Sequence, residues 1–479
     1  MQKRSDAHLD SGTARVTQEF PPLSKSEIQQ VVWRLAAPTL AEMFLVSLVG
    51  IADMIQVGRL GPAAITSVGL TNQPMMLLQS VFQALNVGTT ALVARSIGMD
   101  KPKQASDTLK QTFYVTILLG LTVSLFAGVM APYILKFMGA EPDVIEVGTP
   151  YFQVVGFGFI FNAIAMAIAS ALRGAGDTRT PMTINLVANT VNIIGNAILI
   201  WGLFGFPRWG VFGAGVATVF SRFVAAVWFL TIAVKGEKRL KLDLKERYKP
   251  DLEILGRIYY IGLPAAAEQL VLRTGQVMFA KVVSSLGTVT FAAHQVSMNI
   301  LSLTFMPGQA FATAATTLVG QNLGAERPDD AERCANTSRN MGLVVGIVMA
   351  VVFIFFGKYI AWLYTGDMSV VLVSALVLRI YAFAQPFQST QFILAGGLRG
   401  AGDTMYPLYS TAAGMWIGRV ALGWFFVNVA HWGLPGAWLG MTMDQVLRGT
   451  LILLRFRAGK WKSIKVWEDR KKLVDVEAE

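Results

Sequence analysis

The residues of this sequence best suited to chemistry are a few carboxylates inside long apolar segments. Glu42 and Asp53 lie eleven residues apart, close to three helical turns, so one helix would present both on roughly one face. Glu268 lies in a later segment, and Asp444 precedes Arg448 by four residues in the last one. Apolar surroundings disfavour a charged carboxylate, so such a group takes up a proton readily, and with oxygen neighbours it can bind a small cation. The sequence therefore predicts a site that exchanges protons or small cations.

The segments that carry these carboxylates are long enough to cross a lipid bilayer as helices. Of the 479 residues, 53% are hydrophobic and 15% are charged, which is too apolar for an ordinary soluble enzyme. Apolar runs of about 20 residues match the thickness of a bilayer. The sequence predicts an all-α integral membrane protein with about twelve transmembrane helices, near residues 31–57, 68–94, 112–135, 151–171, 182–204, 211–234, 254–280, 291–318, 340–364, 371–396, 406–430 and 434–456.

The chain contains two copies of one unit. Residues 172–178 and 398–404 both read LRGAGDT, an offset of 226 residues. The same offset aligns two pairs of charged residues, Glu42 with Glu268 and Arg222 with Arg448. Six spans in each copy bring both copies into the membrane from the same side. We therefore expect two six-helix lobes related by a pseudo-two-fold axis along the membrane normal.

The repeated motif predicts a loop between two helices in each lobe. Its glycines would end one helix, with Arg173 and Arg399 near the negative end of the helix dipole. A phosphate-cradling loop is the alternative, but the motif has no Gly-Lys-Ser or Gly-Lys-Thr and follows no predicted strand.

The repeat divides the chain into five parts. We expect a polar N-terminal arm at 1–30, an N-lobe at 31–234, a charged linker at 235–253, a C-lobe at 254–457 and a tail at 458–479. Lys and Arg are much more frequent in loops after even-numbered spans than after odd-numbered ones. The positive-inside rule then places both termini in the cytoplasm and the protein in the cytoplasmic (inner) membrane.

Composition argues against several other classes. The net charge of +11 could suggest nucleic acid, but the Lys and Arg lie in short segments between spans, so we expect no nucleic-acid partner. The single Cys334 excludes a disulfide framework, and three His residues without a shared spacing give no basis for a structural metal site. The spans contain no nucleophile–base or metal-ligand arrangement, so we expect no enzyme activity and no cofactor.

The chain resembles the multidrug and toxic compound extrusion (MATE) family over nearly all of residues 30–457. The resemblance is carried by both LRGAGDT copies, by Asp53–Gly58 (DMIQVG), and by Leu286-Gly287 followed by Ala292–Val296 (AAHQV). It implies an antiporter, driven by H+ or Na+, that exports amphipathic and mostly cationic compounds. It also implies that the chain works in the lipid bilayer as a monomer, with small-molecule organic cations as partners.

The resemblance implies a cation-coupling site in the N-lobe. Asp53 is present, Asn162 and Thr218 match polar positions of relatives, and Asn192 is followed by Asn196 where relatives carry a second carboxylate. Together with Glu42, these residues form the expected coupling site. The site would hold either a proton or a transient Na+ at Asp53.

The C-lobe departs from the family pattern. Leu272 and Gln388 stand where relatives carry acidic residues, so Glu268, Gln388 and Asp444 are the expected C-lobe site residues. Each acidic residue also has a purely structural interpretation. Glu42 and Glu268 could bond neighbouring helices, with Arg273 as a partner of Glu268, and Asp444 could form an ion pair with Arg448.

The expected mechanism is alternating access, in which two lobes rock about a central cleft while substrate and coupling cation compete for carboxylates. A lipid-linked or polysaccharide flippase of the same superfamily is the alternative, and it would favour a strongly cationic cavity. The natural substrate, the choice between H+ and Na+ and the stoichiometry stay open.

Overall fold

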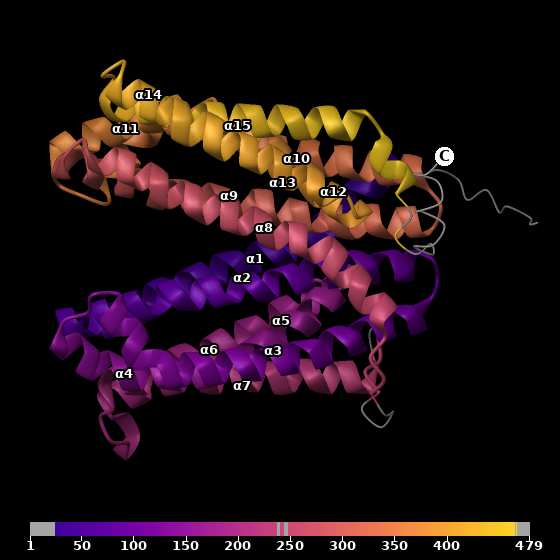
Figure 1. The fold of residues 1–479 in the computed structure, drawn as a ribbon, viewed down its shortest axis with the longest axis horizontal. Helices are drawn as coiled ribbons and strands as arrows, with labels where there is room; N and C mark the ends of the chain where they lie inside the picture. Colours follow the sequence, from indigo (N-terminus) through magenta and orange to yellow (C-terminus); the bar gives the residue numbers. More distant parts are fainter. Residues whose placement is uncertain (1–23, 237–239, 244–247, 465, 467–479) are drawn as a thin grey trace, which may run out of the picture.

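The computed structural model describes residues 24–236, 240–243, 248–464 and 466, and these residues form a bundle of long helices (Figure 1). The half coloured indigo to magenta and the half coloured pink to yellow form two lobes that lie against each other. The N-lobe contains α1 (Lys25–Gly58), α2 (Pro62–Gly98), α3 (Pro102–Phe137), α4 (Pro142–Phe157), α5 (Phe159–Gly174), α6 (Arg179–Trp201) and α7 (Gly210–Lys235).

The C-lobe repeats this order, and more of its spans are broken. It contains α8 (Leu252–Ser284), α9 (Thr288–Gly324), α10 (Pro328–Trp362), α11 (Met368–Ala382), α12 (Gln385–Ala401), α13 (Met405–Ala413), a π-helical segment η2 (Gly414–Ala421), α14 (Leu422–Asn428) and α15 (Gly433–Arg457). Each of the twelve predicted spans corresponds to one helix or to one broken helix, which confirms the all-α membrane fold in two six-helix lobes.

Most of the helices that are long and apolar enough to cross a membrane lie in the N-lobe. Among the described residues, seven helices are long and apolar enough to cross a bilayer, and the pair α11 and α12, bent by 56°, would make an eighth. The remaining spans carry buried polar residues such as Glu268 and Asp444, which lower their mean hydropathy. Both side chains face the protein interior.

The helices extend beyond the predicted spans. α1 begins at Lys25, inside the stretch predicted as a polar arm, because Ser24 and Glu27 form a reciprocal capping box. Residues 1–23 of that arm lie outside the described residues. The linker prediction falls between the end of α7 and the start of α8, and it too lies partly outside them, as does most of the predicted tail.

The LRGAGDT motif forms the same helix end in both lobes. Gly176 (φ +88°) and Gly402 (φ +92°) adopt left-handed conformations that only glycine takes without strain. The carboxylate of Asp177 then accepts hydrogen bonds from the backbone and hydroxyl of Thr180 in the next helix. The motif is therefore a helix-ending loop, as predicted.

The first halves of α1 and α8 each pack on the opposite lobe. Ile28, Val32, Leu35 and Ala36 of α1 are buried against α9, α10 and α12, while Ile254, Ile258 and Ile261 of α8 are buried against α2. At the same end of the molecule α2 and α9 touch through their backbones. A methyl group added at Gly98 would lie 1.9 Å from the carbonyl oxygen of Gln321, so only glycine permits this approach. The two lobes are closed at the end where α1 begins.

A segment after α15 also joins the two lobes. Trp461 is fully buried in the C-lobe, where its ring stacks on Phe456 at 4.7 Å. A few residues on, Arg95 of α2 donates to the carbonyl of Ile464 (2.9 Å) and Arg257 of α8 donates to that of Val466 (2.9 Å). We call residues 460–464 and 466 the tail segment; it lies at the closed end, where it contacts α2 and α8.

Candidate functional site

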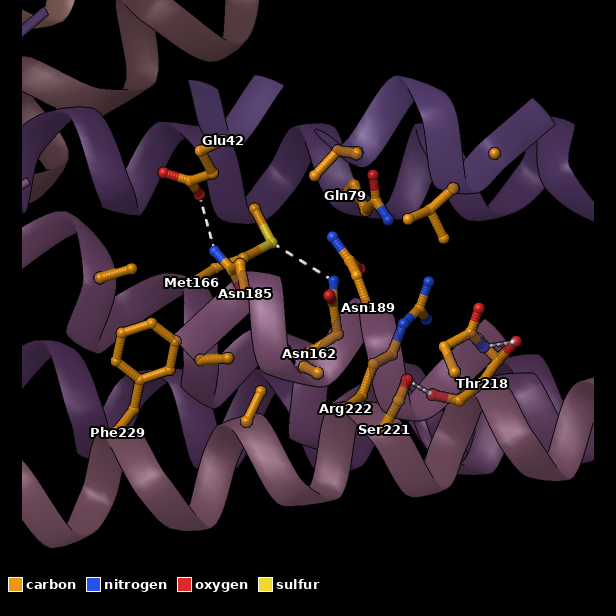
Figure 2. Close-up of a pocket in the computed structure, with 18 of the residues that line it drawn as sticks. Glu42, Gln79, Asn162, Met166, Asn185, Asn189, Thr218, Ser221, Arg222 and Phe229 are labelled. Atoms are coloured by element: carbon orange, nitrogen blue, oxygen red, sulfur yellow. Dashed lines mark hydrogen bonds between the residues drawn. The ribbon is translucent and has the colours of Figure 1, made fainter. Parts of the chain in front are cut away.

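The N-lobe encloses a polar cavity of about 400 Å³ between α1, α2, α5, α6 and α7 (Figure 2). Side chains from these helices converge on it, so the site depends on the lobe as a whole. The polar and charged lining residues are Glu42, Asp53, Gln79, Asn162, Arg173, Asn185, Asn189, Asn192, Thr218, Ser221 and Arg222. A cavity of this volume suits a small-molecule ligand.

One face of α6 supplies the amides of the cavity. Asn185, Asn189, Asn192 and Asn196 follow one another at spacings of four, three and four residues, which places them on a single helix face. Three of them line the cavity, and the fourth lies beside it against Asp53.

Asp53 is held by amides from α6. The Asn196 amide donates to Oδ1 of Asp53 at 2.7 Å. Because a carboxylate can only accept, the Asn192 amide is best satisfied with its nitrogen toward Asp53 (2.9 Å to Oδ1) and its oxygen 3.2 Å from the Thr218 hydroxyl. Asn192 and Asn196 are both buried. One carboxylate surrounded by amide and hydroxyl groups is suited to hold a proton or a monovalent cation.

Glu42 lies in the same cavity and has different partners. Its Oε1 accepts from Arg173 (2.7 Å) and from Asn185 (2.6 Å), while Oε2 has no hydrogen-bond partner among the described residues. The arginine comes from the LRGAGDT motif, so this contact ties α1 to the loop that follows α5.

The C-lobe repeats the Glu42 arrangement with matching residues. Glu268 accepts from Arg399 (2.9 and 2.7 Å) and from the Thr411 hydroxyl (3.0 Å). Arg399 and Thr411 lie 226 residues after Arg173 and Asn185. The predicted pairing of Glu268 with Arg273 is wrong, because the motif arginine is nearer and approaches both carboxylate oxygens, whereas Arg273 is exposed.

Asn162 also reaches the cavity. It projects from α5, and its amide lies 3.3 Å from the sulfur of Met166 (Figure 2). The structure therefore brings the six residues predicted for the N-lobe into one place, since Glu42, Asp53, Asn162, Asn192 and Thr218 line the cavity and Asn196 bonds Asp53.

Arg222 is a cavity residue that sequence reasoning missed. It lies one helical turn beyond Thr218 on α7, and its Nη1 is buried without a hydrogen-bond partner among the described residues. A buried donor left unpaired is costly, so water or a ligand in the cavity would stabilise it. The sequence did contain one sign that Arg222 matters, because it aligns with Arg448 at the 226-residue offset between the two repeats. Asn185 and Asn189 were missed too, although their spacing on α6 pointed to the cavity.

The predicted C-lobe residues lie in three separate hydrogen-bond networks within the described part of the chain. Glu268 bonds Arg399 and Thr411, while Gln388 accepts from the Tyr381 hydroxyl (2.8 Å) and lies 3.5 Å from Thr304. Asp444 bonds Arg448, which confirms the predicted ion pair, and it also bonds Arg419. A joint site of Glu268, Gln388 and Asp444 stays a prediction.

Twelve helical spans in two repeats, with a polar cavity inside one lobe, define a multi-pass membrane transporter. The MatE family model matches the chain twice, at residues 38–198 and 264–425, once in each lobe. The chain is 31% identical to the "Probable multidrug resistance protein NorM" of Thermotoga maritima over 443 residues, which cover 92% of this chain and 95% of that protein. The chain belongs to the MATE family of multidrug efflux transporters.

Other comparisons agree on the fold. The "Uncharacterized transporter YisQ" of Bacillus subtilis is 26% identical and covers 90% of this chain and 94% of its own length. A solved MOP superfamily transporter from Pyrococcus furiosus superposes with a TM-score of 0.84 at 23% identity, covering 91% of this chain and 97% of that one. A solved "outward-facing conformation of a multidrug resistance MATE family transporter" superposes with a TM-score of 0.83 at 23% identity, covering 90% and 97%.

Proposed function

We propose that this protein is a secondary antiporter that exports amphipathic, mostly cationic compounds in exchange for H+ or Na+ by alternating access. The observation that carries this proposal is Asp53, a single carboxylate held by Asn196 and Asn192 beside a cavity of about 400 Å³. The coupling residues are Asp53, Glu42, Asn192, Asn196, Asn162 and Thr218. An organic cation and a small coupling cation would compete for the same negative charge.

The proposed cycle uses that competition. When a proton or Na+ reaches Asp53, the carboxylate is neutralised and its attraction for an organic cation is lost, so the compound leaves. Loss of the coupling cation on the other side of the membrane restores the charge. Because each ligand binds one state of Asp53 better, each can shift the equilibrium between the two orientations of the lobes.

The closed end of the molecule is the proposed cytoplasmic end. Both described ends of the chain lie there, and the excess of Lys and Arg in the loops of that side favours the cytoplasm. In this arrangement the glycine contacts between α2 and α9 close the cytoplasmic side. We further propose that the chain works as a monomer in the cytoplasmic membrane, without a cofactor.

Charge balance in the cavity argues against the flippase alternative. Glu42 and Asp53 carry negative charge, and Arg173 and Arg222 carry positive charge, so the lining residues are balanced overall. A lipid pyrophosphate would need a clear excess of cationic side chains.

The test is efflux of a fluorescent organic cation from proteoliposomes, with a proton gradient and a sodium gradient imposed separately. Efflux driven by one of them supports the antiporter and identifies its ion. Absence of efflux under both gradients, from protein shown to be folded, combined with saturable binding of a lipid pyrophosphate, would replace this proposal with the flippase.

A further inference from the structure

The repeat offset reveals that the C-lobe carries its membrane carboxylate on a different helix. A shift of 226 residues places Asp444 where the N-lobe has Thr218, and Arg448 where it has Arg222. The same shift places Phe279 at the position of Asp53. Each lobe therefore has a carboxylate near the arginine of its last span. In the N-lobe this carboxylate is Asp53, on α1, whereas in the C-lobe it is Asp444, on α15, the same helix as Arg448.

Asp444 has two arginine partners, and all three side chains are buried. Arg419 approaches Oδ2 with Nε (2.9 Å) and Nη2 (2.7 Å), and Arg448 approaches it with Nη2 (2.8 Å). The exposed fraction is 0% for Asp444 and 4% for each arginine. The guanidinium carbon of Arg419 also lies 5.9 Å from the ring centre of Phe279, within the range of a cation–π contact.

Arg419 gives the cluster of Asp444, Arg448 and Arg419 an excess of one positive charge. Asp444 and Arg448 form a neutral pair on one helix, separated by one turn. Arg419 adds a second positive charge, and no further carboxylate among the described residues is bonded to this pair to balance it. Burying such a charge is costly unless the surroundings favour a cation. The Asp444 oxygen and the Phe279 ring provide such surroundings, so this position is built to hold a cation.

The backbone is shaped to bring Arg419 into this position. It lies in the π-helical segment η2, where the wider turn interrupts the α-helical face. Gly414 and Gly418 remove the side chains that would block the approach, since a methyl group there would lie 2.4 Å from Cγ of Arg448 and 2.7 Å from Cα of Asp444. In the N-lobe the position of Gly418 is held by Asn192, a ligand of Asp53.

We propose that Arg419 is a tethered cation that permanently occupies the C-lobe counterpart of the Asp53 site. The C-lobe therefore exchanges no cation of its own, and only the N-lobe site couples to a gradient. Removal of the Arg419 side chain leaves a site for a small planar cation of the guanidinium class, bounded by Asp444 and Phe279. The binding claim does not depend on transport, so it can fail or hold independently of the antiporter proposal.

The test is binding of methylguanidinium in detergent, by titration calorimetry and by thermal unfolding, to purified proteins that all carry Asp53→Asn, so that the N-lobe carboxylate cannot bind the probe. We expect saturable binding with a rise in melting temperature for Arg419→Ala, because a ligand that binds only the folded state stabilises it. The Asp53→Asn parent and the variant that adds both Arg419→Ala and Asp444→Asn should show neither effect. Methylurea, a neutral molecule of nearly the same shape, should have no effect on any of the three proteins.

Equal binding by the Asp53→Asn parent, or no binding by the folded protein that adds Arg419→Ala, would overturn the proposal. A second measurement covers the case in which Arg419→Ala does not fold. A hydrophobic carbodiimide, which modifies protonated carboxyl groups in membranes, is applied to wild-type protein, and labelled peptides are identified by mass spectrometry. Asp444 should stay unlabelled, since the guanidinium groups of Arg419 and Arg448 cover its oxygens; labelling of Asp444 that an added coupling cation prevents would show an exchangeable site and sink the proposal.

Discussion

Asp53 on α1 and Asn196 on α6 are joined by a hydrogen bond of 2.7 Å that the Asn196 amide donates. The contact connects two helices that are 143 positions apart in the chain at this point. Because the amide favours a charged carboxylate, proton or cation binding at Asp53 would weaken or rearrange the contact. The link between ion binding and the packing of α1 therefore passes through this pair.

Replacement of Asp53 by Asn should abolish gradient-driven efflux and leave folding intact. The amide has nearly the same shape as the carboxylate but carries no exchangeable charge. Efflux by Asp53→Asn should fall to the rate of protein-free liposomes, whereas Asp53→Glu should keep part of the activity. Size-exclusion profiles and melting temperatures would check folding. Normal gradient-driven efflux by Asp53→Asn would remove Asp53 from the mechanism.

Conversion of Asn196 to Asp should strengthen cation binding at this site. Two carboxylates at hydrogen-bond distance repel each other, and they relieve that repulsion by sharing a proton or binding a cation. Asn196→Asp should therefore retain its coupling proton to higher pH than the wild-type protein. The measurement is the pH profile of efflux, which should shift toward alkaline pH. Asn189→Asp, on the same face of α6 but not bonded to Asp53, serves as the matched control and should shift less.

Loss of Arg399 should destabilise the C-lobe through Glu268. This carboxylate is buried, and truncation of its arginine leaves a charge without its main partner, which typically costs about 3 kcal/mol or more. Arg399→Ala should unfold at a lower temperature than wild-type protein, and Arg399→Lys should lie in between. The double variant Arg399→Ala/Glu268→Gln should recover part of the loss. No recovery would mean that Arg399 acts through other contacts.

The residues proposed for the N-lobe site could be selected from the sequence because their signals are local or periodic. The apolar runs located twelve spans, the 226-residue offset located the lobes, and family resemblance selected Asp53, Asn192 and Asn196. The structure places those residues around one cavity. Here short-range pattern and tertiary structure agree.

The hydrogen-bond partners of Glu42 and Glu268 could not be predicted from local or periodic patterns in the sequence. Glu42 and Arg173 are 131 residues apart, as are Glu268 and Arg399, so their pairing depends on how whole helices pack. Arg419 lies on a π-helical segment. The wider turn of such a segment cannot be predicted from the 3.6-residue periodicity of apolar residues. The motif arginines looked like helix-end residues and are in fact also the ligands of Glu42 and Glu268.

Removal of the Arg222 charge should tighten binding of organic cations. Arg222 carries positive charge into the same cavity as Asp53, and it repels a cationic ligand there. Arg222→Gln keeps a donor for hydrogen bonding and removes that repulsion. Its affinity for a monovalent fluorescent cation, measured by fluorescence titration, should rise by up to about tenfold, which corresponds to about 1.4 kcal/mol. Arg208→Gln, on an exposed loop, is the control and should leave affinity unchanged. Weaker binding by Arg222→Gln would mean that the arginine supports the bound compound.

Cys334 should report opening of the lobes at the closed end. This residue, the only cysteine in the sequence, is buried on α10 in a cluster with Ile28 and Val32 from α1, so α1 shields its thiol while the lobes are closed. Trp461 anchors the tail segment that joins both lobes at the same end, and its truncation should make opening easier. Alkylation of Cys334 by a maleimide should therefore be faster in Trp461→Ala than in wild-type protein, by about tenfold for each 1.4 kcal/mol of lost closure free energy.

In Trp461→Phe, alkylation of Cys334 should stay as slow as in wild-type protein, because an aromatic ring can still stack on Phe456. Unchanged alkylation in folded Trp461→Ala would show that the glycine contacts between α2 and α9 close this end without the tail segment. In that case Arg95, which donates to the tail segment, would be dispensable for closure as well.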